Sequence, residues 1–137
     1  MSRRRKLFVL VLLSVGLPLA LLALDHGLRP ALTADELQAR LGTDTAPVIL
    51  DVRTPAEFAA GHIPGARNVP LRELAAQPAE LAAAKGDVVI TCAHGPRASL
   101  ARLFMTVGPE QRVSYLRGHM AEWLAAGRPL EGTDRAP

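Results

Sequence analysis

The sequence is poor in cysteine, and Cys92 is the only one among 137 residues. A chain with a single thiol cannot form an internal disulfide, a Cys-x-x-Cys redox pair, or a zinc site built on such a pair. The four histidines are scattered along the chain and lack the spacing of metal ligands. We therefore expect neither a metal nor a cofactor.

Aromatic residues are few, and the excess positive charge is confined to one end of the chain. The net charge is +3 at pH 7, but residues 3–6 carry four of the sixteen basic side chains. Residues 7–137 contain the remaining twelve basic side chains and thirteen acidic ones, so their net charge is −1. With one Trp, one Tyr and three Phe, this body has neither the basic surface nor the stacking residues typical of nucleic-acid binding.

The basic flank, residues 1–6, precedes eighteen uncharged and mostly apolar residues, 7–24. As a helix this run spans about 27 Å, enough to cross a bilayer core. Basic residues stay on the cytoplasmic side, which places the body on the opposite side. We predict a single transmembrane anchor followed by a linker, residues 25–30. The alternative is a cleaved signal peptide ending at Ala23, although Leu21 then stands where a small residue is wanted.

With either an anchor or a cleaved signal, the body is expected outside the cytoplasm. The simplest location is the bacterial inner membrane, with the domain facing the periplasm. The anchor would also place the domain close to the membrane, where a membrane-protein partner is possible.

The body alternates helices and strands. Two capping boxes, Thr33-x-x-Glu36 and Thr54-x-x-Glu57, predict helix starts, and Gly42 and Gly61 predict the helix ends. Further helices are predicted over residues 71–84, 97–107 and 120–126, and strands over 47–51, 67–69, 87–91 and 113–116. Short apolar strands between helices predict an α/β fold with a central parallel sheet flanked by helices. This domain should cover residues 31–132, with 133–137 as a tail.

Three polar stretches follow predicted strands, namely residues 51–53, the loop that begins at Cys92, and residues 117–119. Ligands of parallel α/β sheets bind beyond the carboxyl ends of the strands. We therefore expect these three stretches to gather at one edge of the sheet. The only thiol would then lie where chemistry is carried out.

The loop "CAHGPRAS" joins a strand to a helix and contains Gly95 and Arg97. Loop amides and a helix N-terminus both attract an anion, so we expect them to favour the thiolate of Cys92. A thiolate is the nucleophile, and also the leaving group, in sulfur transfer. The alternative, an inert buried thiol that ends a strand, does not explain the glycine, the arginine and the following helix.

The segments "DVRTPAEFAAGHIPGARNVP", "CAHGPRAS" and "YLRGHMAEWLAAGRPLEG" together resemble the rhodanese-like sulfurtransferase domain. The resemblance implies a three-layer fold and a nucleophile, Cys92, that carries sulfur as a persulfide from a thiosulfate-type or persulfide donor to a thiol acceptor. It implies that Asp51 and Arg53 support the site. The implied substrate-binding loop consists of Ala93, His94, Gly95, Pro96, Arg97 and Ala98.

The loop departs from related patterns in several places. Phosphatases of this architecture need five residues between Cys and Arg, and Arg97 comes one residue too early for a phosphatase. Within the rhodanese-like pattern, Pro96 offers no backbone N–H to an anion. Ala98 stands where Ser or Thr often follows the arginine, and His119 replaces the second Gly of a frequent Gly-Gly pair before Met. The alternative function is therefore a catalytically weak sulfur-carrier or interaction module at the membrane.

Four other side chains have simpler interpretations. We expect Trp123 to anchor the core and His62 to fix the "GHIPGA" turn by hydrogen bonding. His94 lies inside the loop, where its imidazole could contact an anionic donor. His119 could approach the same mouth if the predicted topology is correct.

Overall fold

The computed structural model describes residues 12–17, 20, 31–74, 76, 86–105 and 112–132. Within these residues, five strands form one parallel sheet in the order β1-β5-β4-β2-β3. They are β1 (Ala31–Leu32), β2 (Val48–Asp51), β3 (Arg67–Asn68), β4 (Val88–Thr91) and β5 (Val113–Leu116). The predicted central parallel sheet is confirmed, and β1 is a strand that the sequence patterns did not reveal.

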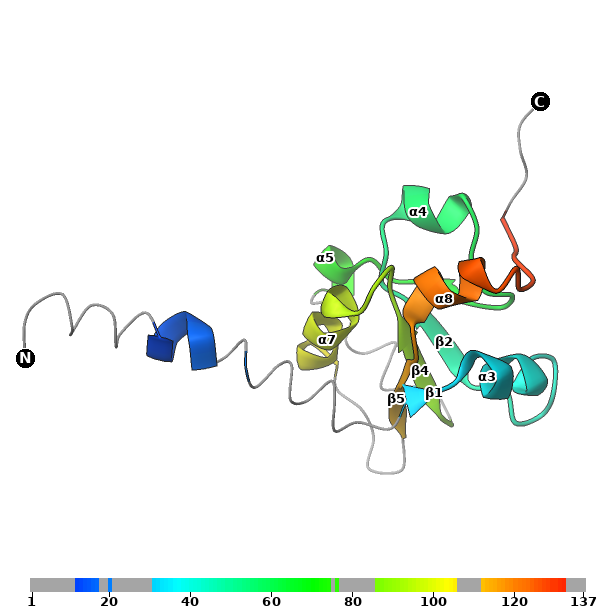
Figure 1. Ribbon diagram of the computed structural model, residues 1–137, viewed down its shortest axis with the longest axis horizontal. Coiled ribbons are helices and arrows are strands. Elements are labelled where there is room, and N and C mark those ends of the chain that lie inside the picture. The colour runs from blue at the N-terminus through cyan, green and yellow to red at the C-terminus, as the bar shows by residue number, and fades with distance from the viewer. Residues whose placement is uncertain are drawn as a thin grey trace, which may run out of the picture.

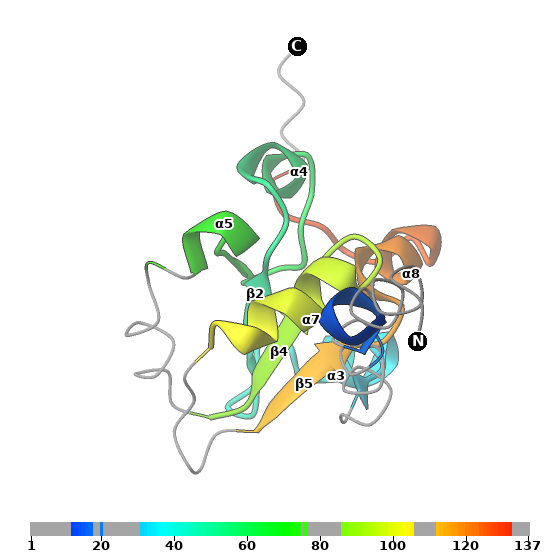
Figure 2. The same cartoon turned by 90° about the vertical axis from the view of Figure 1, so that its left-hand side faces the viewer.

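Helices cover both faces of the sheet (Figures 1 and 2). The helices are α3 (Ala34–Arg40), α4 (Pro55–Ala59), α5 (Leu71–Leu74), α7 (Pro96–Leu103) and α8 (His119–Ala125). On one face, residues of α5 and α7 pack into a core with Leu50, Ile90 and Tyr115. On the other face, α3 and α8 contribute Leu37, Met120 and Trp123 to a second core. The fold is therefore a three-layer α/β sandwich.

Both predicted capping boxes are present in full. The hydroxyl of Thr33 accepts from the Glu36 N–H at 3.2 Å, and the Glu36 carboxylate accepts from the Thr33 N–H at 2.8 Å. Thr54 and Glu57 repeat this arrangement at the start of α4, where Pro55 occupies the first helical position. In each box the Thr and Glu side chains accept from backbone N–H groups that the helix itself leaves unpaired.

Two predicted helices differ in extent. The helix predicted to reach residue 107 ends at Leu103, where the Phe104 and Met105 N–H groups donate to carbonyls three residues earlier; Met105 itself is only 6 % exposed. The Arg102 guanidinium donates to the Met105 carbonyl oxygen at 3.2 Å and stabilises this turn. Of the helix predicted over 71–84, the structure shows α5 as Leu71–Leu74, and most of the remaining residues lie outside the described part.

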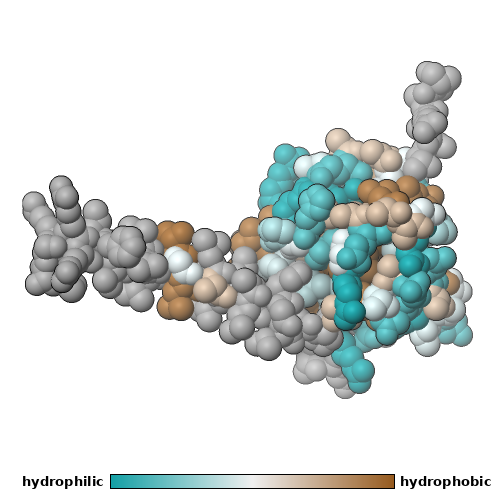
Figure 3. All heavy atoms as spheres, viewed as in Figure 1, coloured by the Kyte–Doolittle hydropathy of each residue, from teal (hydrophilic) through white to brown (hydrophobic). Residues whose placement is uncertain are grey.

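Most of the predicted anchor, residues 7–24, lies outside the described part of the chain. Within it the structure shows a short π-helix, η1 (Leu12–Gly16), part of which is coloured as hydrophobic in Figure 3, whereas the visible face of the domain mixes hydrophilic and hydrophobic residues. No helix among the described residues is both long and apolar enough to cross a bilayer. The structure thus does not support the transmembrane helix, and the anchor stays a prediction.

The three polar stretches that follow the strands do lie at one edge of the sheet. Asp51 pairs in register with Thr91, the residue before Cys92, and Ile90 pairs with Tyr115 on the next strand. Strands β2, β4 and β5 are direct neighbours, so their carboxyl ends open onto a common space. Helix α4 lies beyond these ends, above the sheet in Figure 1.

Candidate active site

Cys92 occupies the first position of the tight loop between β4 and α7. Gly95 of this loop has φ 123° and ψ −47°, a conformation that side-chain-bearing residues rarely adopt. In this conformation the Gly95 N–H donates to the Cys92 Sγ at 2.9 Å. Pro96 then begins α7, and its fixed φ suits the first helical position. The loop therefore presents one backbone donor directly to the sulfur.

The start of α8 holds the other side of the loop. The Met120 N–H donates to the Cys92 carbonyl at 3.0 Å, and the Ala121 N–H donates to the Ala93 carbonyl at 3.1 Å. The Cys92 N–H in turn points at His119 Nδ1, 3.4 Å away. His119 is buried and has a positive φ of 51°. His119 thus lies against the backbone of the loop, and its approach to a bound ligand stays a prediction.

Arg97 is held by a carboxylate from a different helix. Its two terminal nitrogens donate to the Glu57 carboxylate at 2.7 and 2.8 Å, across 40 residues of sequence. These hydrogen bonds raise the pKa of Arg97, and the charges of Glu57 and Cys92 act in the same direction. The bonds from Arg97, followed by those from Thr54, lower the pKa of Glu57. The cation near the sulfur is therefore paired within the protein.

Asp51 and Arg53 form a buried ion pair beneath this edge. The Arg53 Nη2 lies 2.7 Å from Asp51 Oδ2 and also donates to the Gly61 carbonyl at 2.8 Å. The Asp51 side chain is fully buried, and Arg53 is 5 % exposed. Asn68 donates to the carbonyls of Asp51 and Arg53, both at 2.9 Å. The predicted supporting pair thus ties β2 to the loop that follows α4.

The predicted loop residues differ in their exposure. Cys92 is only 1 % exposed, and Ala98 is fully buried in the core cluster that also contains Cys92. His94 and Pro96 are exposed, whereas Ala93 and Arg97 are half-buried. Because the Ala98 side chain faces the core, only its backbone could contact a ligand. Whether these residues bind substrate stays a prediction.

Two of the simpler interpretations agree with the structure. Trp123 is fully buried, and its indole N–H donates to the Pro129 carbonyl at 2.9 Å. His62 stacks on Phe58 with ring centroids 3.6 Å apart, and its Nδ1 lies 2.9 Å from the Phe58 carbonyl. His62 also forms an antiparallel backbone bridge with Glu131. Both residues therefore serve the fold.

Sequence reasoning missed the second role of Glu57. The capping-box pattern revealed its bond to Thr54, but nothing in the local sequence indicated that the same carboxylate holds Arg97. Asn68 was missed as well, since it was read as part of a short strand. Only the pairing of β2 with β3 brings Asn68 beside Asp51.

Comparisons with known proteins agree with this geometry. A family model described as "Rhodanese-like domain" matches residues 33–126. A protein named "Sulfurtransferase" from Allochromatium vinosum is 33 % identical over 97 residues, which cover 71 % of this chain and 90 % of that protein.

Solved structures give the same result. A thiosulfate sulfurtransferase from Pseudomonas aeruginosa is 34 % identical with a TM-score of 0.64, and the match covers 77 % of this chain and 21 % of that one. The rhodanese-like domain of an Anabaena protein is 31 % identical with the same TM-score, and the match covers 80 % and 86 % of the two chains. With a parallel three-layer fold and a cysteine loop held between β4 and α7, the chain belongs to the rhodanese-like sulfurtransferase family.

Proposed function

We propose that the protein is a sulfurtransferase that carries sulfane sulfur as a persulfide on Cys92. The observation that carries this proposal is the Gly95 N–H, which donates to Cys92 Sγ at 2.9 Å from a backbone conformation suited to glycine. A donor in this place stabilises a sulfur anion, whether the attacking thiolate or the persulfide that replaces it. The family membership supports the same reaction class.

The sulfur enters and leaves by two exchange steps. The Cys92 thiolate attacks the outer sulfur of a thiosulfate-type or persulfide donor, a new S–S bond forms, and the electron pair of the broken S–S bond leaves with the rest of the donor. An external thiolate then attacks the outer sulfur and regenerates Cys92. Because the chain has one cysteine, the acceptor thiol must come from another molecule.

Mass spectrometry of the intact protein tests this proposal. Incubation with thiosulfate or a persulfide donor should add the mass of one sulfur atom at Cys92, and an acceptor thiol should remove it. Cys92→Ser should fold normally and take up no sulfur, because a hydroxyl is a far weaker nucleophile than a thiolate at neutral pH. If the folded wild type stays unmodified with every donor, the alternative of a catalytically weak interaction module is favoured.

We also propose that residues 7–24 anchor the domain to the bacterial inner membrane, with the domain facing the periplasm. The basic flank before the apolar run supports this orientation. A reporter fused after Pro137 that works only in the periplasm should be active. Activity of a reporter that works only in the cytoplasm would contradict the orientation, and a mature form that begins near Leu24 would indicate a cleaved signal peptide.

A further inference from the structure

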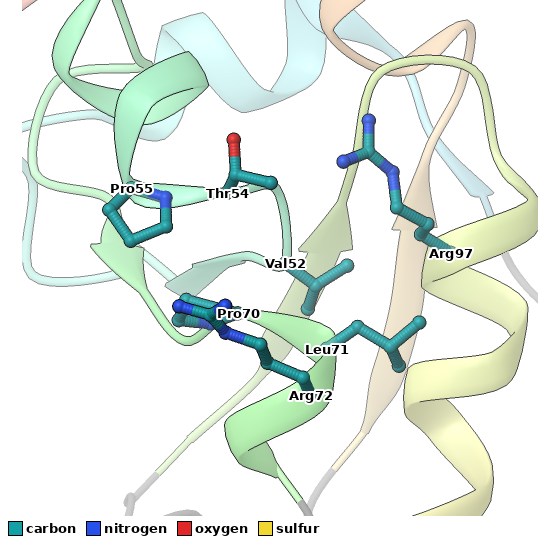
Figure 4. Close-up of a pocket in the computed structure, with 7 residues that line it drawn as sticks. All are labelled: Val52, Thr54, Pro55, Pro70, Leu71, Arg72 and Arg97. Carbon is teal, nitrogen blue, oxygen red and sulfur yellow. The ribbon is translucent and has the colours of Figure 1, made fainter.

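A pocket of about 340 Å³ opens beside the cysteine loop, between the end of β2 and the first turns of α5 and α7 (Figure 4). This volume lies at the low end of the range of about 300–1,000 Å³ that is typical of small-molecule sites. Four apolar side chains line the pocket: Val52, Pro55, Pro70 and Leu71. The pocket therefore offers an organic group a place to bury its surface.

The pocket lies beside residues that surround the sulfur, while Cys92 itself is only 1 % exposed and does not line it. Val52 belongs to the same buried cluster as Cys92, and Leu71 packs against that cluster. The Val52 N–H donates to the carbonyl of Thr91, the residue before Cys92, at 3.0 Å. Arg97, from the helix that follows the loop, lines the pocket on the α7 side. A ligand in this pocket would lie next to the reactive loop.

The polar groups of the pocket are already engaged. The Arg97 guanidinium makes both of its short contacts, 2.7 and 2.8 Å, to the Glu57 carboxylate. The Thr54 hydroxyl also donates to Glu57, at 2.8 Å. Arg72 is the other cation among the described residues of the lining; its side chain is 77 % exposed, and its Nε lies 3.4 Å from the Glu73 carboxylate. A small, strongly hydrated dianion such as thiosulfate thus finds little unpaired positive charge here.

We propose that this pocket binds the organic body of the sulfur carrier, so that the site selects an organic thiosulfonate or persulfide over inorganic thiosulfate. Glu57 is the positioning residue for this selection, because its carboxylate neutralises Arg97. The inference rests on the proposed sulfurtransferase function and names its substrate class. An anionic group on the carrier can reach Arg72 at the edge of the pocket.

Transfer from an organic thiosulfonate balances without any other reagent. The Cys92 thiolate attacks the outer sulfur of R–SO₂–S⁻, and a bond forms between the two sulfurs. The bond from the outer sulfur to the sulfonyl sulfur breaks, and its electron pair leaves with the sulfinate R–SO₂⁻. The products are the Cys92 persulfide anion and the sulfinate, and no proton is exchanged.

The first test compares two donors on the full chain, benzenethiosulfonate and inorganic thiosulfate. We expect the wild type to show the higher kcat/KM with benzenethiosulfonate. Leu71→Ala removes an apolar side chain from the pocket lining. It should lower the ratio of kcat/KM for benzenethiosulfonate to kcat/KM for thiosulfate about tenfold, the effect typical of losing methylene contacts in a pocket. Leu103→Ala is the matched control, since Leu103 is 67 % exposed on α7 outside the pocket and should leave the ratio unchanged.

The second test releases Arg97. Glu57→Gln keeps a side chain that completes a capping box but removes the charge that neutralises Arg97. The kcat/KM for thiosulfate should rise about tenfold, because a freed guanidinium makes a charge-assisted hydrogen bond to the dianion. Glu36→Gln is the matched control, because Glu36 occupies the equivalent position in the other capping box. It should not change the preference between donors.

The outcomes separate this inference from the function on which it rests. Sulfur uptake from neither donor would overturn the proposed function and the inference with it. Two other outcomes would overturn the inference and leave the proposed function standing. One is sulfur transfer with equal kcat/KM for both donors, and the other is a ratio of the two kcat/KM values that neither Leu71→Ala nor Glu57→Gln changes.

Discussion

Replacing Arg53 with leucine should destabilise the fold severely, because it leaves the Asp51 carboxylate buried without its counter-charge. In the wild type this carboxylate accepts from the Arg53 backbone N–H at 3.0 Å and from the guanidinium at 2.7–3.0 Å. Asp51 is fully buried, so water cannot replace the guanidinium. Breaking a buried pair from one side costs about 3–5 kcal/mol.

The Gly61 carbonyl also loses its donor, Arg53 Nη2 at 2.8 Å, which adds about 1 kcal/mol. The free energy of unfolding should therefore fall by about 4–6 kcal/mol, a large part of the 5–15 kcal/mol typical of a domain. With a slope of about 2 kcal/mol per molar urea, the midpoint moves down by about 2–3 M.

Urea unfolding followed by fluorescence measures this change, since Trp123 is the only tryptophan and is buried. The control is the double variant Asp51→Asn with Arg53→Leu, which removes both charges and should recover part of the lost stability. A loss below about 1 kcal/mol in Arg53→Leu, or a double variant less stable than the single one, would refute the reasoning.

Two further predictions concern the core and the acid response. Trp123→Phe removes the donor to the Pro129 carbonyl and leaves a cavity, so the free energy of unfolding should fall by about 1–3 kcal/mol; this variant has no tryptophan, so circular dichroism follows its unfolding, and an unchanged urea midpoint would contradict the prediction. The pKa of Glu57 is lowered from its ordinary value of 4.5, so the charged carboxylate stabilises the fold fully at pH values above 4.5. This contribution is lost as the pH falls below 4.5 towards the lowered pKa. The stability gap between wild type and Glu57→Gln should therefore shrink below pH 4.5, and a gap that widens in acid would contradict the assignment.

Much of the fold could be predicted because its signals are local. A capping box needs only four consecutive residues, and both boxes, at Thr33 and Thr54, occur where the sequence placed them. The apolar run that became β4 ends at Thr91, one residue before the cysteine, as expected. By contrast, β1 has only two residues and exists through its pairing with β5, more than 80 residues later in the chain. No local pattern encodes such a pairing.

The candidate site shows the same division between local and long-range information. Placing Cys92 at the edge of the sheet required only the strand pattern and the rule for parallel sheets. The partner of Arg97 could not be predicted, because Glu57 lies 40 residues away and already had a local explanation as a capping residue. The sequence indicated only that a cation, Arg97, lies in the cysteine loop, and the fold shows that Glu57 pairs with it.

The two outer strands of the sheet, β1 and β3, are each two residues long. A long, flat edge strand offers unpaired amides and carbonyls to another chain, and short edges are one way in which proteins resist aggregation. The three longer strands thus lie between the two short ones: β5 pairs with β1, β2 pairs with β3, and β4 lies in the middle. Because Ala31 and Leu32 pair with Tyr115 and Leu116, removing them should leave that side of β5 uncovered and open to strand-to-strand association.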